Sequence, residues 1–132
     1  MTAPGVIAEL PEADRAFLTE KKLEYDVEQA DGFLHVIIHG FELPPTYTPR
    51  TCDLLIRLPS GYPNGNPDMF WTRPDVKLLT GNWPVNADVW QDFLNVRWQR
   101  WSRHFPDGRW RAGIDGLDTY LASIRRELAL GR

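Results

Sequence analysis

The sequence predicts an α+β fold in which an N-terminal helix, an antiparallel β-meander, a long loop and a C-terminal helix follow one another. Three observations predict this order: a helix-start signal near residue 10, stretches that alternate with a period of two, and a closing apolar stripe with helical spacing. The chain has 132 residues, enough for one compact domain and too few for two. We expect residues 1–9 to be a tail and residues 10–130 to form the single domain.

The first helix is predicted to begin at Leu10-Pro11-Glu12 and to end near Lys22. Proline is tolerated in the first turn of a helix, and acidic side chains there interact favourably with the positive end of the helix dipole.

Three strands are predicted in the middle of the chain. Residues 33–41 alternate with a period of two and are apolar on both faces, with Leu34, Val36 and Ile38 on one side and Phe33, His35, Ile37, His39 and Phe41 on the other. Residues 51–58 predict a second strand after the proline-rich connection 43–49, and residues 68–72 a third after the turn-rich loop 59–67. Because the connections are short, we expect the strands to pair in an antiparallel meander.

The second half of the chain divides into an irregular part and a helical part. Residues 77–109 show neither the period of two of a strand nor the spacing of three and four of a helix, so we expect a long irregular loop. Such long loops in compact domains are usually functional or mobile. The closing helix is predicted from apolar residues spaced alternately by three and four. These residues are Ile114, Leu117, Leu121, Ile124 and Leu128.

Composition narrows the class of protein. The chain is 42% hydrophobic and 12% aromatic, as expected of a folded domain. Its single cysteine, Cys52, excludes an internal disulfide and a thiolate zinc site and fits a reducing compartment. No apolar run approaches the roughly 20 residues of a membrane span. We therefore expect a cytoplasmic protein with no membrane partner.

Positive charge is concentrated in residues 97–111, which hold five arginines and one acidic residue. Three interpretations follow for these arginines and the interleaved Trp98, Trp101 and Trp110. The tryptophans pack under the loop with the arginine heads in water, the segment binds an acidic or carboxylate-terminated protein tail, or it binds single-stranded nucleic acid. We favour them in that order, because the isoelectric point of 5.6 is far from that of strongly basic nucleic-acid-binding domains.

Several motifs together resemble the ubiquitin-conjugating-enzyme family, and more narrowly its prokaryotic family E. The resemblance covers roughly residues 10 to 130, and its Trp-rich segment is the specific part. The motifs are Pro59-x-x-Tyr62-Pro63 with Trp71, Arg73-Pro74-Asp75 in the place of a His-Pro-Asn tripeptide, Asp68-Met69-Phe70, the run from Trp98 to His104, and Trp110-Arg111-x-Gly113-x-Asp115-Gly116-Leu117.

The resemblance implies a ubiquitin-conjugating-enzyme-like fold and a role in ubiquitin-like conjugation. Members of family E occur in bacterial operons beside ubiquitin-like proteins, an activating enzyme and a metalloprotease. A ubiquitin-like protein and an activating enzyme are the implied partners. ATP would be used by the activating enzyme, so we expect no cofactor in this chain.

The chain departs from the family pattern at the expected acyl acceptor. No cysteine lies between Asp75 and Ser102, and an ionised Asp75 would repel the oxyanion that an asparagine stabilises. Cys52 lies in a predicted strand ahead of the tripeptide, where a half-buried structural role is the stronger interpretation. The alternative to a carrier is therefore a non-catalytic adaptor that binds a ubiquitin-like protein or an activating enzyme.

Ser102 occupies the place where the resemblance puts the acceptor. In an extended segment Ser102 and His104 point to one side, so His104 is the candidate general base for an oxyester mechanism. Asp107 or Asp75 is the candidate to orient His104, and Arg103 with neighbouring amides to stabilise the oxyanion. The competing interpretation is that Ser102 caps a turn and His104 is an ordinary surface residue.

Candidates for binding the incoming tail and for metal binding complete the set. The tail-binding candidates are Arg100, Trp101, Arg73 and Asp75. His35 and His39 lie four residues apart on one predicted strand, about 13 Å in extended backbone, which is too far to share one zinc ion. We therefore assign no metal site.

Overall fold

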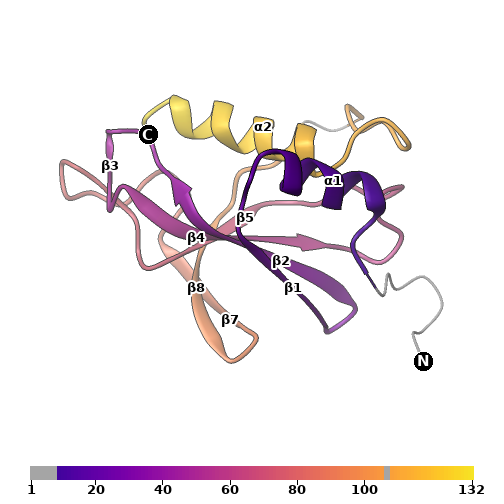
Figure 1. Cartoon of the computed structure of the whole chain (residues 1–132). Coiled ribbons are helices and arrows are strands. Elements are labelled where there is room, and N and C mark those ends of the chain that lie inside the picture. Colours follow the sequence, from indigo (N-terminus) through magenta and orange to yellow (C-terminus); the bar gives the residue numbers. More distant parts are fainter. Residues whose placement is uncertain (1–8, 106–107) are drawn as a thin grey trace.

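In the computed structural model, which describes residues 9–105 and 108–132, two helices lie on one side of an antiparallel sheet (Figure 1). Six strands of the described chain form this sheet in the order β1-β2-β4-β5-β8-β7, and β3 pairs with β6. The helices are α1 (Glu12–Glu20) and α2 (Leu117–Ala129). The strands are β1 (Tyr25–Ala30), β2 (Phe33–Glu42), β3 (Tyr47–Thr48), β4 (Thr51–Leu58), β5 (Phe70–Arg73), β6 (Lys77–Leu78), β7 (Val89–Phe93) and β8 (Val96–Trp101).

The predicted α+β order is confirmed, with both helices and the meander strands present. Strand β4 has the predicted bounds, and α1 lies inside the predicted range. The closing helix begins later than expected, because Ile114 lies ahead of α2 and its side chain is 65% exposed.

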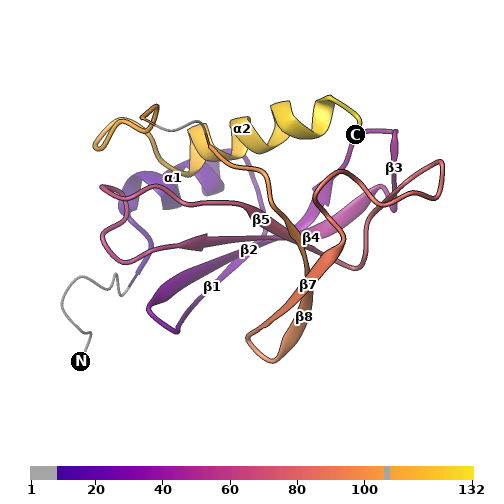
Figure 2. The same cartoon turned by 180° about the vertical axis from the view of Figure 1, so that it is seen from behind.

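Three features differ from the prediction, and the first is that the proline-rich connection 43–49 contains β3, which pairs with β6. Strand β1 was not predicted; it pairs with β2 at one edge of the sheet, and four of its six residues are exposed. Residues 77–109 are not one irregular loop, since β7 and β8 form an antiparallel hairpin that extends the sheet beyond β5. The hairpin projects away from the helices, as the reverse view shows (Figure 2).

A bulge in β2 corrects the predicted faces of that strand. Leu34, Val36 and Ile38 point into the core as expected, but Phe41 joins them instead of lying on the opposite face. The pairing with β4 shifts between Ile38 and Phe41, where Gly40 adopts a φ of +65°. The extra residue reverses the alternation, and glycine supplies the left-handed conformation without steric cost.

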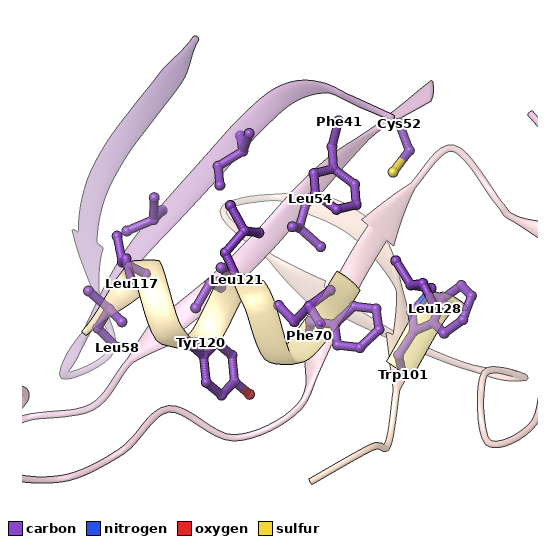
Figure 3. Packing of buried hydrophobic residues seen from close by; sticks show 14 of the residues in the cluster. Phe41, Cys52, Leu54, Leu58, Phe70, Trp101, Leu117, Tyr120, Leu121 and Leu128 are labelled. Atoms are coloured by element: carbon purple, nitrogen blue, oxygen red, sulfur yellow. The ribbon is translucent and has the colours of Figure 1, made fainter. Parts of the chain in front are cut away.

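The main core fills the space between α2 and the sheet (Figure 3). Four apolar side chains of α2 contribute to it, namely Leu117, Leu121, Ile124 and Leu128. Burying each of these side chains stabilises the fold by about 1.5–3 kcal/mol. Across from the helix, Trp101 is 0% exposed and stacks on Phe70 with ring centroids 5.2 Å apart. The core therefore fixes the end of β8 and the start of β5 against α2.

No helix of the described chain covers the opposite face of the sheet, and side chains of the sheet shield it instead. Leu55, Trp71 and Trp98 form a second buried cluster there. The guanidinium of Arg57 lies 3.9 Å from the Phe33 ring centroid and 4.0 Å from that of Phe93. Its aliphatic stem and the two rings cover apolar surface while the charge interacts with the ring faces. Within the described residues, no helix is long and apolar enough to cross a membrane.

Candidate acyl-transfer site

The candidate site lies where β8 ends. Strand β8 stops at Trp101, and a hydrogen bond from the Arg103 amide to the Trp101 carbonyl, 2.9 Å long, turns the chain at Ser102. The Ser102 amide donates to the Asn86 carbonyl at 2.9 Å. Ser102 is half-buried and is therefore held by main-chain contacts on both sides without being sealed in the interior.

Ser102, His104 and Asp68 form a contiguous chain of hydrogen bonds. The Ser102 Oγ lies 3.4 Å from His104 Nε2, and His104 Nδ1 lies 2.7 Å from Asp68 Oδ1. With the Nδ1 proton donated to the carboxylate, Nε2 carries the lone pair that accepts the serine hydroxyl. This is the order of groups that activates a serine for attack on a carbonyl carbon.

Strand pairing explains why Asp68 is there. The β5–β8 pairing ends where Phe70 lies opposite Trp101, so Asp68, two residues before Phe70, and His104, three residues after Trp101, leave the same end of this strand pair. Tyr120 of α2 donates its hydroxyl to the carbonyl oxygen of Met69 at 2.7 Å, which anchors this turn to the helix. Sequence reasoning missed Asp68 as a partner of His104, although the aspartate belongs to one of the motifs of the resemblance.

The cluster is open to solvent. The side chains of His104 and Asp68 are 58% and 52% exposed. An exposed ion pair contributes little to folding, with a median near 0–1 kcal/mol. The His104–Asp68 contact therefore contributes little to the free energy of unfolding.

Among the described residues, the aspartate that contacts His104 is Asp68 and not Asp75. Asp107 lies outside the described residues. The Asp75 carboxylate accepts the indole N–H of Trp90 at 2.8 Å. Asp75 follows the far end of β5, whose Thr72 pairs with Gln99, so the tripeptide does not lie beside the Ser102–His104 pair.

The Arg103 side chain, the predicted oxyanion stabiliser, lies among main-chain oxygens, and its Nη1 has no hydrogen-bond partner among the described residues. Its side chain is 6% exposed and donates to the Val85 carbonyl at 3.2 and 3.0 Å and to the main-chain oxygen of Arg132. The guanidinium also lies 3.8 Å from Glu127 and 4.8 Å from the Trp101 ring centroid. These contacts direct the guanidinium toward Val85 and the end of α2, and its oxyanion role stays a prediction.

The tail-binding candidates separate into buried and accessible residues. Trp101 is fully buried in the core and is not available to a tail. Arg73 is exposed, and Arg100 is half-buried with an Nε that has no hydrogen-bond partner among the described residues. Trp98 is 2% exposed, so neither it nor Trp101 presents a ring face on which a base would stack. The packing interpretation therefore holds for these two tryptophans.

Cys52 is placed as a structural residue. Its side chain is 4% exposed in the main core, and burial raises the pKa of its thiol to about 12 (Figure 3). A thiol in that state supplies almost no thiolate at neutral pH, and thiolate is the reactive form.

The two histidines of β2 each have partners other than a metal. His39 bridges Asp26 at 2.7 Å and Asp53 at 3.1 Å, and hydrogen bonds to these carboxylates raise its pKa. His35 is 1% exposed and accepts a hydrogen bond from Arg57 at 3.1 Å. Burial, followed by the charge of Arg57, lowers the pKa of His35. Among the residues that the structure describes, no three potential metal ligands converge.

An exposed apolar segment adjoins the site, and sequence reasoning did not identify it. Trp83, Val85 and Val89 are 37%, 47% and 41% exposed. Trp83 packs edge-on against Trp90 with centroids 5.0 Å apart. The carbonyl oxygens of Val85 and Asn86 bind Arg103 and Ser102, so this surface is coupled to the end of β8.

One known protein family is similar to this chain over most of its length. The family model described as prokaryotic E2 family E matches residues 10–130. No curated protein and no solved structure matches the chain.

Proposed function

Because the chain belongs to prokaryotic E2 family E, we propose that it is a serine-based acyl carrier of the ubiquitin-like conjugation type. It would accept the C-terminal carboxyl group of a ubiquitin-like protein from the thioester of an activating enzyme. It would then transfer that group to an amine. The observation that carries this proposal is the Ser102–His104–Asp68 chain of hydrogen bonds, which supplies a nucleophile, a base and an orienting carboxylate in a chain whose one thiol is buried.

Acyl transfer to Ser102 follows from the roles of these groups. Nε2 of His104 removes the hydroxyl proton as Oγ attacks the thioester carbonyl carbon, and the protonated imidazole is stabilised by Asp68. Collapse of the tetrahedral species expels the thiolate of the activating enzyme, which takes the proton from His104. The product is an oxyester on Ser102. Such an ester is less reactive toward amines than a thioester, so the acceptor amine must be held in place.

The test is intact-mass analysis of the protein after incubation with its activating enzyme, ubiquitin-like partner and ATP, with acid quenching at early times. We expect an adduct that survives thiol reductant, is cleaved by hydroxide and disappears in Ser102→Ala. Cys52→Ala is the matched control and should keep the adduct, because that thiol is buried. An adduct that persists in Ser102→Ala, or is released by reductant, would contradict the oxyester.

The exposed segment around Trp83 and Val85 supports a second candidate, a non-catalytic adaptor of the same fold. Apolar side chains gathered on a surface commonly mark a protein contact. If no adduct forms while the activating enzyme itself is charged, and the ubiquitin-like protein still co-elutes with this chain, the adaptor function is supported instead. Replacing Trp83 by Ala should then weaken co-elution.

A further inference from the structure

The solvent exposure of the His104–Asp68 pair bears on what happens to an ester on Ser102. More than half of each side chain faces water, and Ser102 itself is half-buried. An imidazole that removes a proton from the serine hydroxyl is equally placed to remove one from a water molecule that approaches the same carbonyl carbon. The site therefore admits water to the acyl group that it holds.

We propose that this chain is also an ester hydrolase, which returns the acyl group on Ser102 to water as a free carboxylate. Hydrolysis of the ester with a ubiquitin-like protein rests on the proposed acyl-carrier function. Hydrolysis of small esters does not depend on it. Its substrate class is an activated acyl group, a thioester or oxyester whose leaving group is a weak base.

The hydrolytic step balances without a further reactant. Nε2 of His104 takes a proton from water as the water oxygen attacks the ester carbonyl carbon. The tetrahedral species then collapses, the bond from the carbonyl carbon to Ser102 Oγ breaks, and the imidazolium returns the proton to Oγ. The products are the carboxylic acid, which ionises, and the free serine. Asp68 is a positioning residue, because it acts through His104 and touches no reacting atom.

Water and free amines compete as nucleophiles for the ester carbonyl carbon, and water is favoured whenever no acceptor amine is bound. A lysine amine with an ordinary pKa near 10.4 is neutral in only about one part in 2,500 at pH 7. Water needs no deprotonation before it binds and is present at every exposed site. Hydrolysis is thus the default fate of the ester, and aminolysis requires an acceptor that displaces water from His104.

The test uses the purified chain with p-nitrophenyl acetate, and release of p-nitrophenolate is followed by absorbance. We expect a rapid phase of about one equivalent from acetylation of Ser102, followed by sustained turnover from deacetylation, and both should be lost in Ser102→Ala. His104→Gln should slow the two phases by about 10²–10⁴-fold. Asp68→Asn should lower kcat with little change in KM, and Asp68→Glu should recover part of the loss.

His39→Gln is the matched control for reaction at an ordinary surface imidazole. His39 also contacts two carboxylates, and within residues 9–105 and 108–132 it has no serine partner. Hydrolysis that falls in His39→Gln and persists in Ser102→Ala would overturn the inference. Thermal unfolding of every variant shows whether a loss of hydrolysis reflects misfolding. Because His104 and Asp68 are exposed to solvent, we expect their variants to fold normally.

The outcomes separate the hydrolase from the carrier. One equivalent of acetylation without turnover would overturn the hydrolase and leave the carrier standing. Turnover that depends on Ser102 and His104, together with no adduct from the ubiquitin-like protein, would support the hydrolase and count against the carrier. No acetylation of Ser102 above the Ser102→Ala background would overturn the hydrolase.

Discussion

Gln99 is a buried polar residue of β8, the strand that ends next to the candidate site. Its side chain is 0% exposed and sits in β8, two residues before Trp101. The amide oxygen accepts from the Val76 amide at 2.7 Å and from the Thr72 hydroxyl at 3.1 Å. The amide nitrogen donates to the carbonyl oxygens of Val76 at 2.9 Å and Ala87 at 2.8 Å. One side chain thus ties two connecting segments to the sheet.

Replacing Gln99 by Met keeps an unbranched side chain of similar length and removes every one of these hydrogen bonds. Three main-chain groups of Val76 and Ala87 then lose their partners in a buried site. At about 2 kcal/mol for each of the three unsatisfied buried groups, less about 2 kcal/mol gained from burying an apolar side chain, we expect a loss of about 4 kcal/mol in the free energy of unfolding. That is a large share of the about 5–15 kcal/mol typical of a domain.

The matched control is Gln91→Met in the neighbouring strand β7. Gln91 is half-buried and accepts one hydrogen bond, from the Trp71 indole at 2.9 Å, so its replacement should cost about 1 kcal/mol. Urea unfolding followed by tryptophan fluorescence measures both values. Hydrogen exchange supplies a second measurement, because the Ser102 amide bonds to Asn86 in the tethered segment and should exchange faster only in Gln99→Met. If the two variants differ by less than about 1 kcal/mol, the buried-amide argument is refuted.

Two further predictions concern titratable side chains. His39 has a raised pKa because of its hydrogen bonds to Asp26 and Asp53, so its stabilisation is complete below its ordinary value of 6.5 and is lost as the pH rises through the folded-state pKa. The difference in unfolding free energy between the native chain and His39→Gln should shrink over that range, and a difference independent of pH would count against it. Asp14 accepts the Leu117 amide at the start of α2 at 3.0 Å, and burial raises its pKa. Asp14→Ala should cost about 1–3 kcal/mol in urea unfolding and Asp14→Asn clearly less, since the amide oxygen still accepts and no charge is buried; equal costs would contradict this.

The parts of the fold that the sequence predicts are those whose side chains are sorted by local burial. The core imposes a period on strand β4 and helix α2, so spacing predicts the bounds of β4 and the buried stripe of α2 from Leu117 to Leu128, although the helix starts three residues after Ile114. Strand β1 is an edge strand with four exposed residues, and an exposed edge leaves no apolar alternation to detect. The β7–β8 hairpin was missed for a related reason. Its surface carries both polar and aromatic side chains, such as Arg97 over the Trp90 ring, so its sequence shows no simple polar–apolar alternation.

The candidate site shows the same division between local and non-local information. Ser102 and His104 meet as their spacing of two predicts, although a turn at Ser102 and not a regular strand carries the segment, and the Arg103 side chain between them reaches Val85. The oxyanion role of Arg103 stays a prediction.

Asp68 was beyond the reach of any local rule. It lies 36 residues from His104, and its place depends on the register in which β5 pairs with β8. The pairing ends with Phe70 opposite Trp101, and Asp68 and His104 lie on the two segments that leave this pair. What fixes the register is the core, since Phe70 must stack on Trp101 beneath α2. The packing of two buried rings thus determines whether the surface imidazole has a partner, and a chemical proposal for Ser102 stands on the same contacts that hold the sheet to its helix.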